Sequence, residues 1–419
     1  MTNLVSSWFS GAMDITNDSG RRALVVGLGI SGIATALRLR QIGWTPVIVE
    51  KAASRRSGGY FIALFGAGRA AAQRLGIMDG LSDRTPRDGA NFTIDRIGNR
   101  RLGLGYADLP GKPWMMLRGD IEEAGFDKLP ADVDIRYATV PTHLKQDAEG
   151  VDVTLANTVD GTSVTERFDL VVGADGLRST VRKLAFGPHE KFLRRLNYIV
   201  AAYQLRGPVS DVASDDGAIL LEPDRSMWIF PFADHPPTVL LSYRADDVDA
   251  EFSGSPVERV RAAFGRGPTG RALGEALDAL ESADDLLFDS VEQVHMDRWH
   301  RGRVVLVGDS AWCVTLYAGM GASAGLAGAD LLGTMLDGHP DNVGRALAEW
   351  EKALRPYVEH YQQNGSQQRK FFVPTNRLQL TVRRLMTKGM RSPVTSRVIR
   401  GLQAKSKTAR FKEMDIARA

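Results

Sequence analysis

Hydrophobic positions near the start of the chain predict a strand, a helix and a second strand. The run Ala23–Val26 is short, wholly apolar and followed by glycine, which is typical of a buried strand. Apolar residues then recur three and four positions apart over Ile30–Gln41, which predicts a helix that ends before Gly43. A second apolar run, Pro46–Glu50, completes a β-α-β unit and therefore indicates an α/β fold.

Along the rest of the chain, predicted helices and strands alternate, give way to a strand-rich stretch, and then alternate again. Helices are predicted at Gly66–Leu75 and Asp120–Leu129, hairpins at Asn91–Leu104 and 151–168, and a buried strand at Asp169–Val172. From Lys191 to Ala245 apolar segments separated by turn residues predict an antiparallel sheet, with strands Tyr198–Leu205, Ala218–Glu222, Met227–Phe232 and Val239–Tyr243. Beyond it we expect helix at Pro256–Ala279, strand at Arg303–Val307 and helix from Val343 to the end.

Composition places the chain among ordinary globular proteins. Its 419 residues suffice for two domains, and 43% of them are hydrophobic and 25% charged. Cys313 is the only cysteine, which excludes an intramolecular disulfide and fits a cytoplasmic location. Met1–Gly20 lacks the basic and apolar regions of a secretory signal, so we expect a loose arm. Ser310–Ala329 is uncharged, but its glycines favour a loop leading into a buried helix over a membrane span.

Positive charge is concentrated in the last 51 residues. From Arg369 to the end there are fourteen Lys and Arg against two acids, a local charge of +12 that leaves about −9 for the remainder. Apolar residues in this tail have helical spacing, namely Leu378, Val382, Leu385, Met386, Val394, Val398 and Leu402. Such a segment either offers a basic amphipathic face to a membrane, nucleic acid or anionic substrate, or packs on the acidic body with its charges in water. We favour packing and expect no nucleic-acid partner.

The first of three glycine motifs lies inside the β-α-β unit. In Gly27-Leu-Gly29-Ile-Ser-Gly32 the first glycine permits a tight turn, the second admits a pyrophosphate close to the backbone, and the third lets the helix pack on the strand. Backbone N–H groups and the dipole at the start of the helix favour phosphates. Glu50, at the end of the following strand, is placed to accept from ribose hydroxyls. The sequence therefore predicts a dinucleotide site.

Two further motifs each put a carboxylate just past a buried strand. Asp175 follows Asp169–Val172 in a Gly-Ala-Asp-Gly turn, and Ser179 is expected to cap the helix after it. Asp309 follows Arg303–Val307, and a helix expected to start near Gly321 would direct its positive end toward an anion in front of it.

These three motifs, in this order, resemble those of the class A flavoprotein monooxygenases, the family of para-hydroxybenzoate hydroxylase and of the tetracycline-inactivating and polyketide-tailoring hydroxylases. The resemblance spans roughly residues 21–335. It implies that Gly27–Gly32 and Glu50 bind the ADP half of FAD and that Asp309 holds the ribityl chain. Asp175 would serve FAD and the nicotinamide donor, and Arg118 would also contact FAD. The full set expected to bind the cofactor is Gly27, Gly29, Ile30, Ser31, Gly32, Glu50, Lys51, Arg118, Asp175, Gly308, Asp309, Gly319, Gly321 and Ala322.

The implied architecture is a Rossmann-like FAD-binding domain of the glutathione-reductase type, interrupted by an antiparallel-sheet substrate domain and followed by a C-terminal helical segment. The expected boundaries are 21–84, 114–185 and 288–355 for the FAD-binding domain, and 85–113 with 186–287 for the substrate domain. Residues 1–20 form the arm and 356–419 the basic helical segment.

Several positions depart from the family pattern. Trp312, Leu316 and Met320 stand where His, Pro and Gln are common, and Ala327-Gly328 replaces a common Glu-Asp pair. The glycines and Asp309 are retained, so FAD binding is still expected. The departures bear on the geometry beside the reactive edge of the flavin, where Cys313 and Tyr317 are also expected.

The resemblance implies that NADPH or NADH reduces FAD, that O2 then forms a flavin hydroperoxide, and that an aromatic or polyketide-like substrate takes up one oxygen atom, as in secondary metabolism. The cofactor carries this chemistry, and the sequence identifies no catalytic base or metal site, His295 and His300 included. Trp228 and Phe230 either line the substrate pocket or belong to the core. Two other hypotheses remain open: an FAD-containing reductase, dehydrogenase or cyclase without oxygen insertion, and a flavin-bearing scaffold whose tail binds a membrane or acidic partner.

Overall fold

The fold is mixed α/β, as expected. The computed structural model describes residues 20–55, 58–105, 111–391 and 406–418. Most of the predicted N-terminal arm lies outside these ranges, and so do Val394, Val398 and Leu402 of the tail. Within the described part the strands form four sheets.

The central sheet has six strands in the order β17–β18–β11–β1–β2–β7, parallel except where β17 meets β18. They are β1 (Arg22–Val26), β2 (Thr45–Val49), β7 (Asp134–Arg136), β11 (Leu170–Gly173), β17 (His300–Arg301) and β18 (Val304–Leu306). In the register, Val26 lies beside Gly173, and Gly173 beside Leu306. The chain therefore leaves β1, β11 and β18 at one edge of the sheet.

A second sheet of seven strands runs in the order β16–β12–β15–β14–β13–β4–β5, antiparallel except where β13 meets β4. They are β4 (Asn91–Ile94), β5 (Arg100–Leu102), β12 (Leu193–Gln204), β13 (Gly217–Glu222), β14 (Arg225–Phe230), β15 (Thr238–Arg244) and β16 (Leu287–Val294). Side chains alternate between its faces, so Met227 and Ile229 join one buried cluster while Trp228 and Phe230 join the other.

Two small sheets complete the strands of the described part. One contains β8 (Thr139–Gln146), β9 (Val151–Asn157) and β10 (Ser163–Phe168), and the other pairs β3 (Phe61–Leu64) with β6 (Trp114–Leu117). The α-helices are α1 (Ile30–Gln41), α2 (Gly66–Arg74), α3 (Arg118–Asp127), α4 (Thr180–Ala185), α5 (Val248–Glu251), α6 (Pro256–Phe264), α7 (Gly270–Glu281), α8 (Asp309–Trp312), α9 (Gly321–Gly338), α10 (Val343–Phe372), α11 (Arg377–Arg391) and α13 (Lys407–Glu413).

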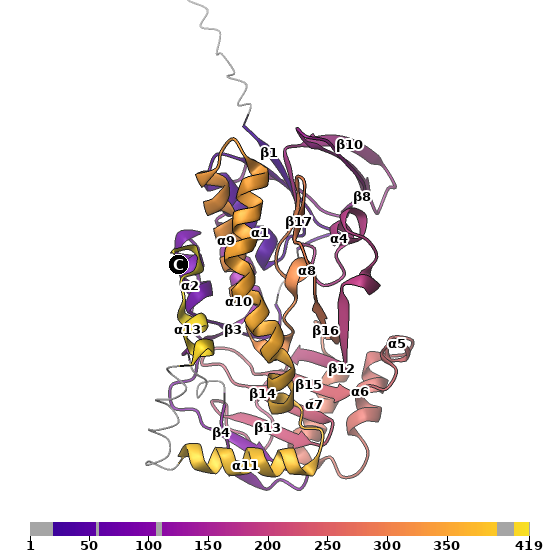
Figure 1. Cartoon of the computed structure of the whole chain (residues 1–419). Coiled ribbons are helices and arrows are strands. Elements are labelled where there is room, and N and C mark those ends of the chain that lie inside the picture. Colours follow the sequence, from indigo (N-terminus) through magenta and orange to yellow (C-terminus); the bar gives the residue numbers. More distant parts are fainter. Residues whose placement is uncertain (1–19, 56–57, 106–110, 392–405, 419) are drawn as a thin grey trace, which may run out of the picture.

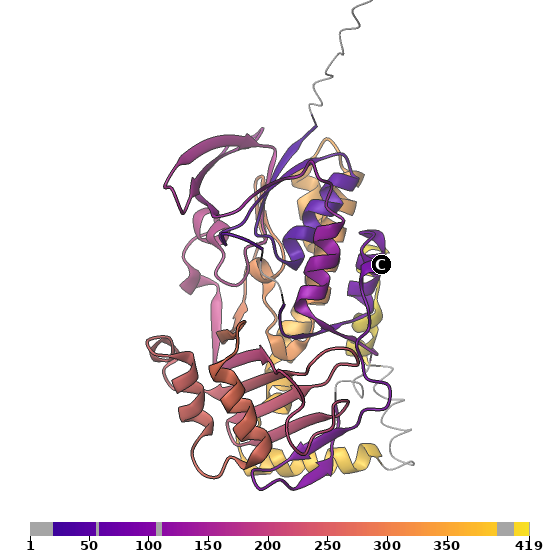
Figure 2. The same ribbon diagram turned by 180° about the vertical axis from the view of Figure 1, so that it is seen from behind.

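The elements build an upper and a lower part, joined by the long helix α10 (Figure 1). In the upper part α9 packs against α1, α2 and α10, while α4 contacts β8, β11 and β18. In the lower part α6 and α7 cover one face of the seven-stranded sheet, which Figure 2 shows from behind. Among the described helices, none is both long and apolar enough to cross a bilayer.

The structure differs from the sequence predictions in two helical regions. The single helix expected at Pro256–Ala279 is two helices, because Gly267 adopts a φ of +90° and Pro268 follows it. The helix expected from Val343 onward is broken between α10 and α11, at Pro374.

The prediction that the apolar positions of the tail pack on the body is wrong for α11. Leu378, Val382, Leu385 and Met386 are all exposed, because the helix turns its Leu380 and Arg383 side toward the body instead.

The last described residues return to the upper part and pack on α2. Both terminal guanidinium nitrogens of Arg74 donate to Asp415, at 2.6 and 2.7 Å. Lys412 is 5% exposed, and its ammonium lies 4.3 Å from the centroid of the Phe65 ring. Burial lowers the pKa of Lys412 to about 8. The charge of this lysine therefore opposes folding, with some compensation from the ring.

Replacing Lys412 with methionine should stabilise the protein at neutral pH by about 1–2 kcal/mol. The lowered pKa means that the unfolded chain binds more protons than the folded one between about pH 8 and pH 10.5, so wild-type stability rises over that window. The advantage of the variant should be largest below pH 8 and vanish toward pH 10.5. Denaturant unfolding at several pH values tests this, with Lys412→Met compared to Lys352→Met, an exposed lysine on α10. An advantage that does not change with pH would refute the electrostatic explanation.

Candidate active site

The three glycine motifs meet at one edge of the central sheet. Gly27 follows β1, Ala174 follows β11, and Gly308 closely follows β18, so parallel pairing brings the turns together. Gly27 has a φ of +105°, and a Cβ there would lie 2.5 Å from the carbonyl oxygen of Ala174. A Cβ on Gly32 would lie 1.9 Å from the carbonyl oxygen of Gly27. Both positions thus require glycine.

One cavity of about 310 Å³ opens beside these turns. Of the residues predicted to bind the cofactor, those that line it are Gly29, Ile30, Ser31, Arg118, Asp309, Gly319, Gly321 and Ala322. Gly27, Gly32 and Gly308 lie behind this wall, where they permit close packing, and Lys51 is exposed. The opposite wall belongs to the seven-stranded sheet and includes Val200, Ala202, Phe230 and Leu240.

Two helices begin at this cavity without a side-chain cap from their own N-cap residues. The N-cap of α1 is Gly29 and that of α9 is Met320, and neither accepts a backbone N–H with its side chain. The first residues of both helices line the cavity. Their positive dipole ends therefore converge on one space, an arrangement that favours an anionic ligand such as a pyrophosphate.

An ion pair lies beside the start of α1. Arg118 pairs with Glu122 at 2.6 Å, and both side chains lie within 3.4 Å of where a Cβ on Gly29 would stand. Burial lowers the pKa of Arg118, but Glu122, Tyr60, Asp309 and Asp285 together outweigh it, so the pKa of Arg118 lies above its ordinary value. Asp309 faces the open cavity and is otherwise enclosed by protein, and this enclosure raises the pKa of its carboxyl against the influence of Cys313 and Arg118.

The other two predicted carboxylates accept hydrogen bonds from backbone N–H groups at the motif turns. Glu50 accepts from the N–H of Leu28 and of Ala52, both at 2.9 Å. Asp175 accepts from Thr180 and Val181 at the start of α4, at 2.6 and 3.1 Å, through one oxygen. Its other oxygen is buried with no partner in the described part of the chain. Ala174, Gly176 and Leu177 line the cavity around it.

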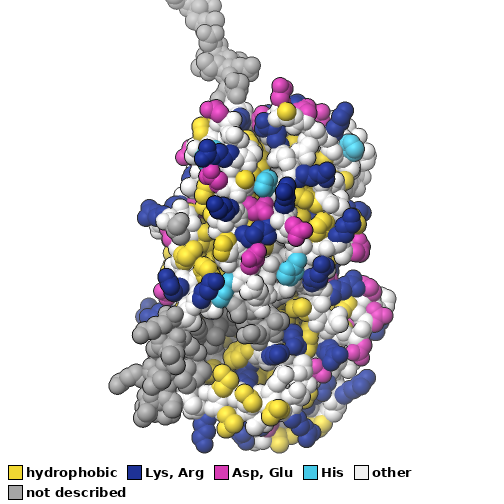
Figure 3. Space-filling view, in the orientation of Figure 1, with side chains coloured by type: hydrophobic (Ala, Val, Ile, Leu, Met, Phe, Trp, Pro, Cys, Tyr) yellow, Lys and Arg dark blue, Asp and Glu magenta, His cyan; other side chains and the backbone are white. Residues whose placement is uncertain are grey.

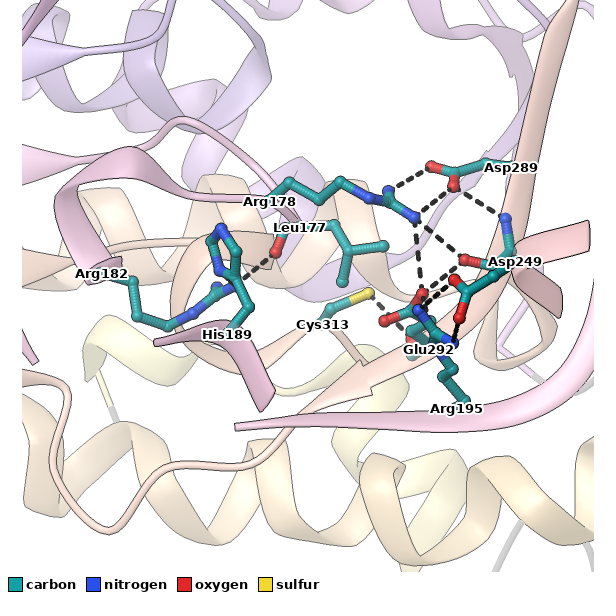
Figure 4. Close-up of polar contacts among 10 residues, drawn as sticks. Leu177, Arg178, Arg182, His189, Arg195, Asp249, Asp289, Glu292 and Cys313 are labelled. Atoms are coloured by element: carbon teal, nitrogen blue, oxygen red, sulfur yellow. Dashed lines mark hydrogen bonds and ion pairs between the residues drawn. The ribbon is translucent and has the colours of Figure 1, made fainter. Parts of the chain in front are cut away.

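An ion-pair cluster borders the same cavity on the side of β16 (Figure 4). Arg178 binds both oxygens of Asp289 and also reaches Ser290 and Glu292. Arg195 pairs with Asp249 at 2.8 Å and lies 3.8 Å from Glu292. Glu292 is 3% exposed, and its Oε2 has no partner among the described residues. The cluster thus leaves one buried acceptor at the cavity wall.

Comparison with known proteins agrees with this geometry. A family model described as FAD binding domain matches residues 116–339, more than half of the chain. A flavin-dependent monooxygenase of Legionella longbeachae is 26% identical over 82% of this chain and 87% of its own length. An FAD-dependent monooxygenase of Sarocladium schorii is 27% identical over 82% and 85%. The chain belongs to the class A FAD-dependent monooxygenases.

Solved structures extend the likeness to the whole fold of this monooxygenase. The tetracycline destructase Tet(51) superimposes with a TM-score of 0.72 at 25% identity, covering 92% of this chain and 97% of its own. Klebsiella pneumoniae HpxO, in its complex with FAD and uric acid, gives a TM-score of 0.72 at 21% identity, covering 93% and 97%. At that identity the second likeness concerns the fold alone.

Of the residues that depart from the family pattern, one lines the cavity and others are buried away from it. Trp312 points away from it and packs against Trp299 and Trp350, with ring centroids 4.8 and 5.8 Å apart. Met320 is fully buried, whereas Leu316 lines the cavity. Only the position usually held by proline therefore borders the ligand space.

Of the residues expected near the flavin edge, one lines the cavity and the other is buried behind it. Cys313 lines the cavity, whereas Tyr317 is buried and its hydroxyl lies 2.6 Å from Ser242. Of the two aromatic residues considered for the pocket, Phe230 lines it and stacks on Phe61 at 4.0 Å, while Trp228 packs behind against Phe372 at 4.6 Å.

Cys313 should resist alkylation in the native enzyme at about pH 8. Burial, followed by the nearby Asp309, raises the pKa of its thiol well above the ordinary value, and the reactive species is the thiolate. Because Cys313 is the only cysteine, labelling with N-ethylmaleimide followed by intact-mass analysis reports on it alone. We expect no adduct before unfolding and a complete single adduct after it. Fast labelling of the native protein would contradict this environment.

Sequence reasoning missed three contributors to the cavity. Tyr60–Ala63, most of β16 and Phe372 all line it. The apolar residues of 287–294 do not alternate with polar ones, so β16 has no clear strand pattern, and the contact of Phe372 depends on the path of α10 and carries no local signal. No cluster of metal-ligating side chains occurs in the described ranges, and His295 and His300 instead contact Gln293 and Glu351.

Proposed function

We propose that this monooxygenase inserts one oxygen atom from O2 into an aromatic or polyketide-like small molecule, with NADPH or NADH as electron donor. In the balanced reaction, substrate C–H, O2, NAD(P)H and a proton give substrate C–OH, NAD(P)+ and water. Bound FAD would supply the redox chemistry, by the route that the resemblance to the class A monooxygenases implies. The observation that carries the proposal is the single cavity shared by the glycine motifs and the apolar face of the seven-stranded sheet.

We further propose the discontinuous domain division expected from the sequence, with the Rossmann-like FAD-binding part at 21–84, 114–185 and 288–355. In it, the uncapped starts of α1 and α9 would receive the anionic groups of FAD, and Asp309 would accept from its hydroxyls. Glu50 and Asp175 would shape the turns, with the free oxygen of Asp175 available to the ligand. Arg118 would contribute a fixed positive charge.

The remaining wall supports a substrate that is largely apolar and carries a polar edge. Val200, Ala202 and Phe230 come from the sheet face, and this apolar wall suits a planar ring. The unpartnered Oε2 of Glu292 would accept from a donor on the substrate or the nicotinamide, since a buried carboxylate oxygen without a hydrogen-bond donor is costly. These residues would position the substrate and exclude water. The reaction requires no protein nucleophile.

The proposal is tested by following NADPH and NADH oxidation with a panel of phenols and polycyclic aromatics and by analysing each product by mass spectrometry. We expect at least one compound to accelerate oxidation and to gain oxygen. Ala202→Leu, which enlarges a side chain on the substrate wall, should lower oxygen insertion about tenfold or more without loss of FAD. Ala213→Leu, at an exposed loop position, is the matched control and should leave both unchanged. Reduction and reoxidation of the flavin without any oxygenated product would favour a reductase or dehydrogenase.

A further inference from the structure

The helix α11 has three distinct sides. Its inner side, with Leu380 and Arg383, packs beneath the seven-stranded sheet beside β13. The guanidinium of Arg383 lies 3.8 Å from the centroid of Phe371 and 5.3 Å from that of Trp228, and it donates to the carbonyl of Phe371. Among the described residues, the helix therefore contacts the body through this side, and its other two sides face outward.

The second side is an exposed apolar stripe. Leu378, Val382, Leu385 and Met386 recur at helical spacing and are 72%, 47%, 65% and 59% exposed. Most other exposed large hydrophobic side chains of the described part are scattered singly, as is normal for a protein surface. A contiguous stripe of four on one helix instead marks an interaction surface.

The third side is basic. Arg377, Arg384 and Lys388 are exposed, and their spacing of seven and four places them on one flank of the stripe. Over Arg377–Arg391 the sequence has five Lys or Arg and no Asp or Glu. Figure 3 shows hydrophobic side chains gathered over this end of the molecule, with Lys and Arg beside them.

We propose that α11 docks this monooxygenase on a lipid surface with anionic headgroups. The stripe would lie among the acyl chain ends, and the basic flank would contact the headgroups, which is the geometry of an interfacial amphipathic helix. This inference concerns where the enzyme acts and does not depend on the proposed reaction.

Charge complementarity favours lipid over the other occupants. A second copy docked antiparallel by twofold symmetry would place the basic flanks of two α11 helices on the same side, where they repel. Nucleic acid would engage the basic flank but leave the apolar stripe in water, because α11 carries no aromatic side chain on which bases could stack.

The docked helix also lies next to the cavity wall. Arg383 contacts Phe371, and its neighbour Phe372 lines the cavity. Docking would therefore bring the substrate half of the cavity close to the membrane, from which an apolar substrate could be taken up.

Vesicle flotation of the FAD-loaded full chain tests the proposal. The vesicles contain phosphatidylcholine alone or with one quarter phosphatidylglycerol. We expect co-flotation with the anionic vesicles only, weakening as salt is raised. Leu385→Ser combined with Met386→Ser should lower the partition coefficient about tenfold or more, and Arg384→Gln combined with Lys388→Gln should abolish the preference for anionic lipid.

The matched control is Ile97→Ser combined with Val159→Ser, which removes two hydrophobic side chains that are 76% and 78% exposed elsewhere. It should float like the wild type, and every variant should keep its flavin absorbance and unfolding temperature. The proposal is overturned if the wild type does not bind anionic vesicles, or if the α11 variants bind as well as the control. It is also overturned if light scattering finds a wild-type dimer that the Leu385/Met386 variant dissociates.

Discussion

Replacing Gly32 with alanine is expected to abolish stable FAD binding. The new Cβ would lie 1.9 Å from the carbonyl oxygen of Gly27 and 2.9 Å from its carbonyl carbon, and both atoms are backbone. No rotamer change can relieve this contact, so α1 must move away from β1. A shift of the helix start by a fraction of an ångström misaligns the N–H groups that face the cavity.

We expect the FAD dissociation constant of Gly32→Ala to rise about a hundredfold and the protein to lose about 3 kcal/mol of stability. Flavin content after purification, fluorescence titration with FAD and denaturant unfolding measure these effects. Gly338→Ala is the matched control, because it replaces a helical glycine at the exposed end of α9 with no atom within 4 Å. It should bind FAD normally and gain a few tenths of a kcal/mol from helix propensity. Wild-type flavin content in Gly32→Ala would show that the motif does not hold the cofactor.

Replacing Asp309 with asparagine should weaken FAD binding about tenfold to a hundredfold while preserving the fold. The amide matches the carboxylate in shape but lacks its charge, and hydrogen bonds to a charged group contribute about 1.5–3 kcal/mol. Asp309 faces the cavity directly after β18, close enough to Arg118 for the two charges to influence each other. The substitution would therefore also leave Arg118 with less compensating charge.

The dependence of FAD affinity on pH separates this charge from a change of shape. Enclosure raises the pKa of Asp309, and the charged form is the acceptor, so wild-type affinity should be present above that pKa and fall as the pH drops through it. Because the pKa is raised, the decline should begin at a higher pH than for an ordinary carboxylate. Asp309→Asn should lack this decline. Asp246→Asn, at a side chain that is 99% exposed, is the control and should follow the wild type. If FAD affinity depends on pH in the same way in all three proteins, Asp309 does not contribute its charge to FAD binding.

The cofactor half of the site was largely predictable from the sequence because its signals are local. A tight turn between a buried strand and a helix needs glycine at fixed offsets, so Gly27, Gly29 and Gly32 could be recognised without a structure. Parallel strands align their carboxyl ends, which is why the turns that carry Asp175 and Asp309 meet at one edge of the central sheet. Their binding roles stay predictions.

The substrate half was less predictable because it is built from distant contacts. Phe372 reaches the cavity only because α10 runs along both parts of the molecule, and Glu292 becomes a buried acceptor only through the packing of β16. Helical periodicity alone does not say which side of a helix meets the body. For α11 the strong apolar spacing pointed to the wrong side, because the aromatic contacts of Arg383 decide how the helix sits.

The most direct test of the account is the fate of molecular oxygen. The enzyme would be supplied with NADPH or NADH, 18O2 and the compound that most accelerates flavin reoxidation, and the product analysed by mass spectrometry. The account predicts one 18O atom in each product molecule and none from labelled water. Complete conversion of 18O2 to hydrogen peroxide with every compound, leaving all of them unlabelled, would contradict oxygen insertion.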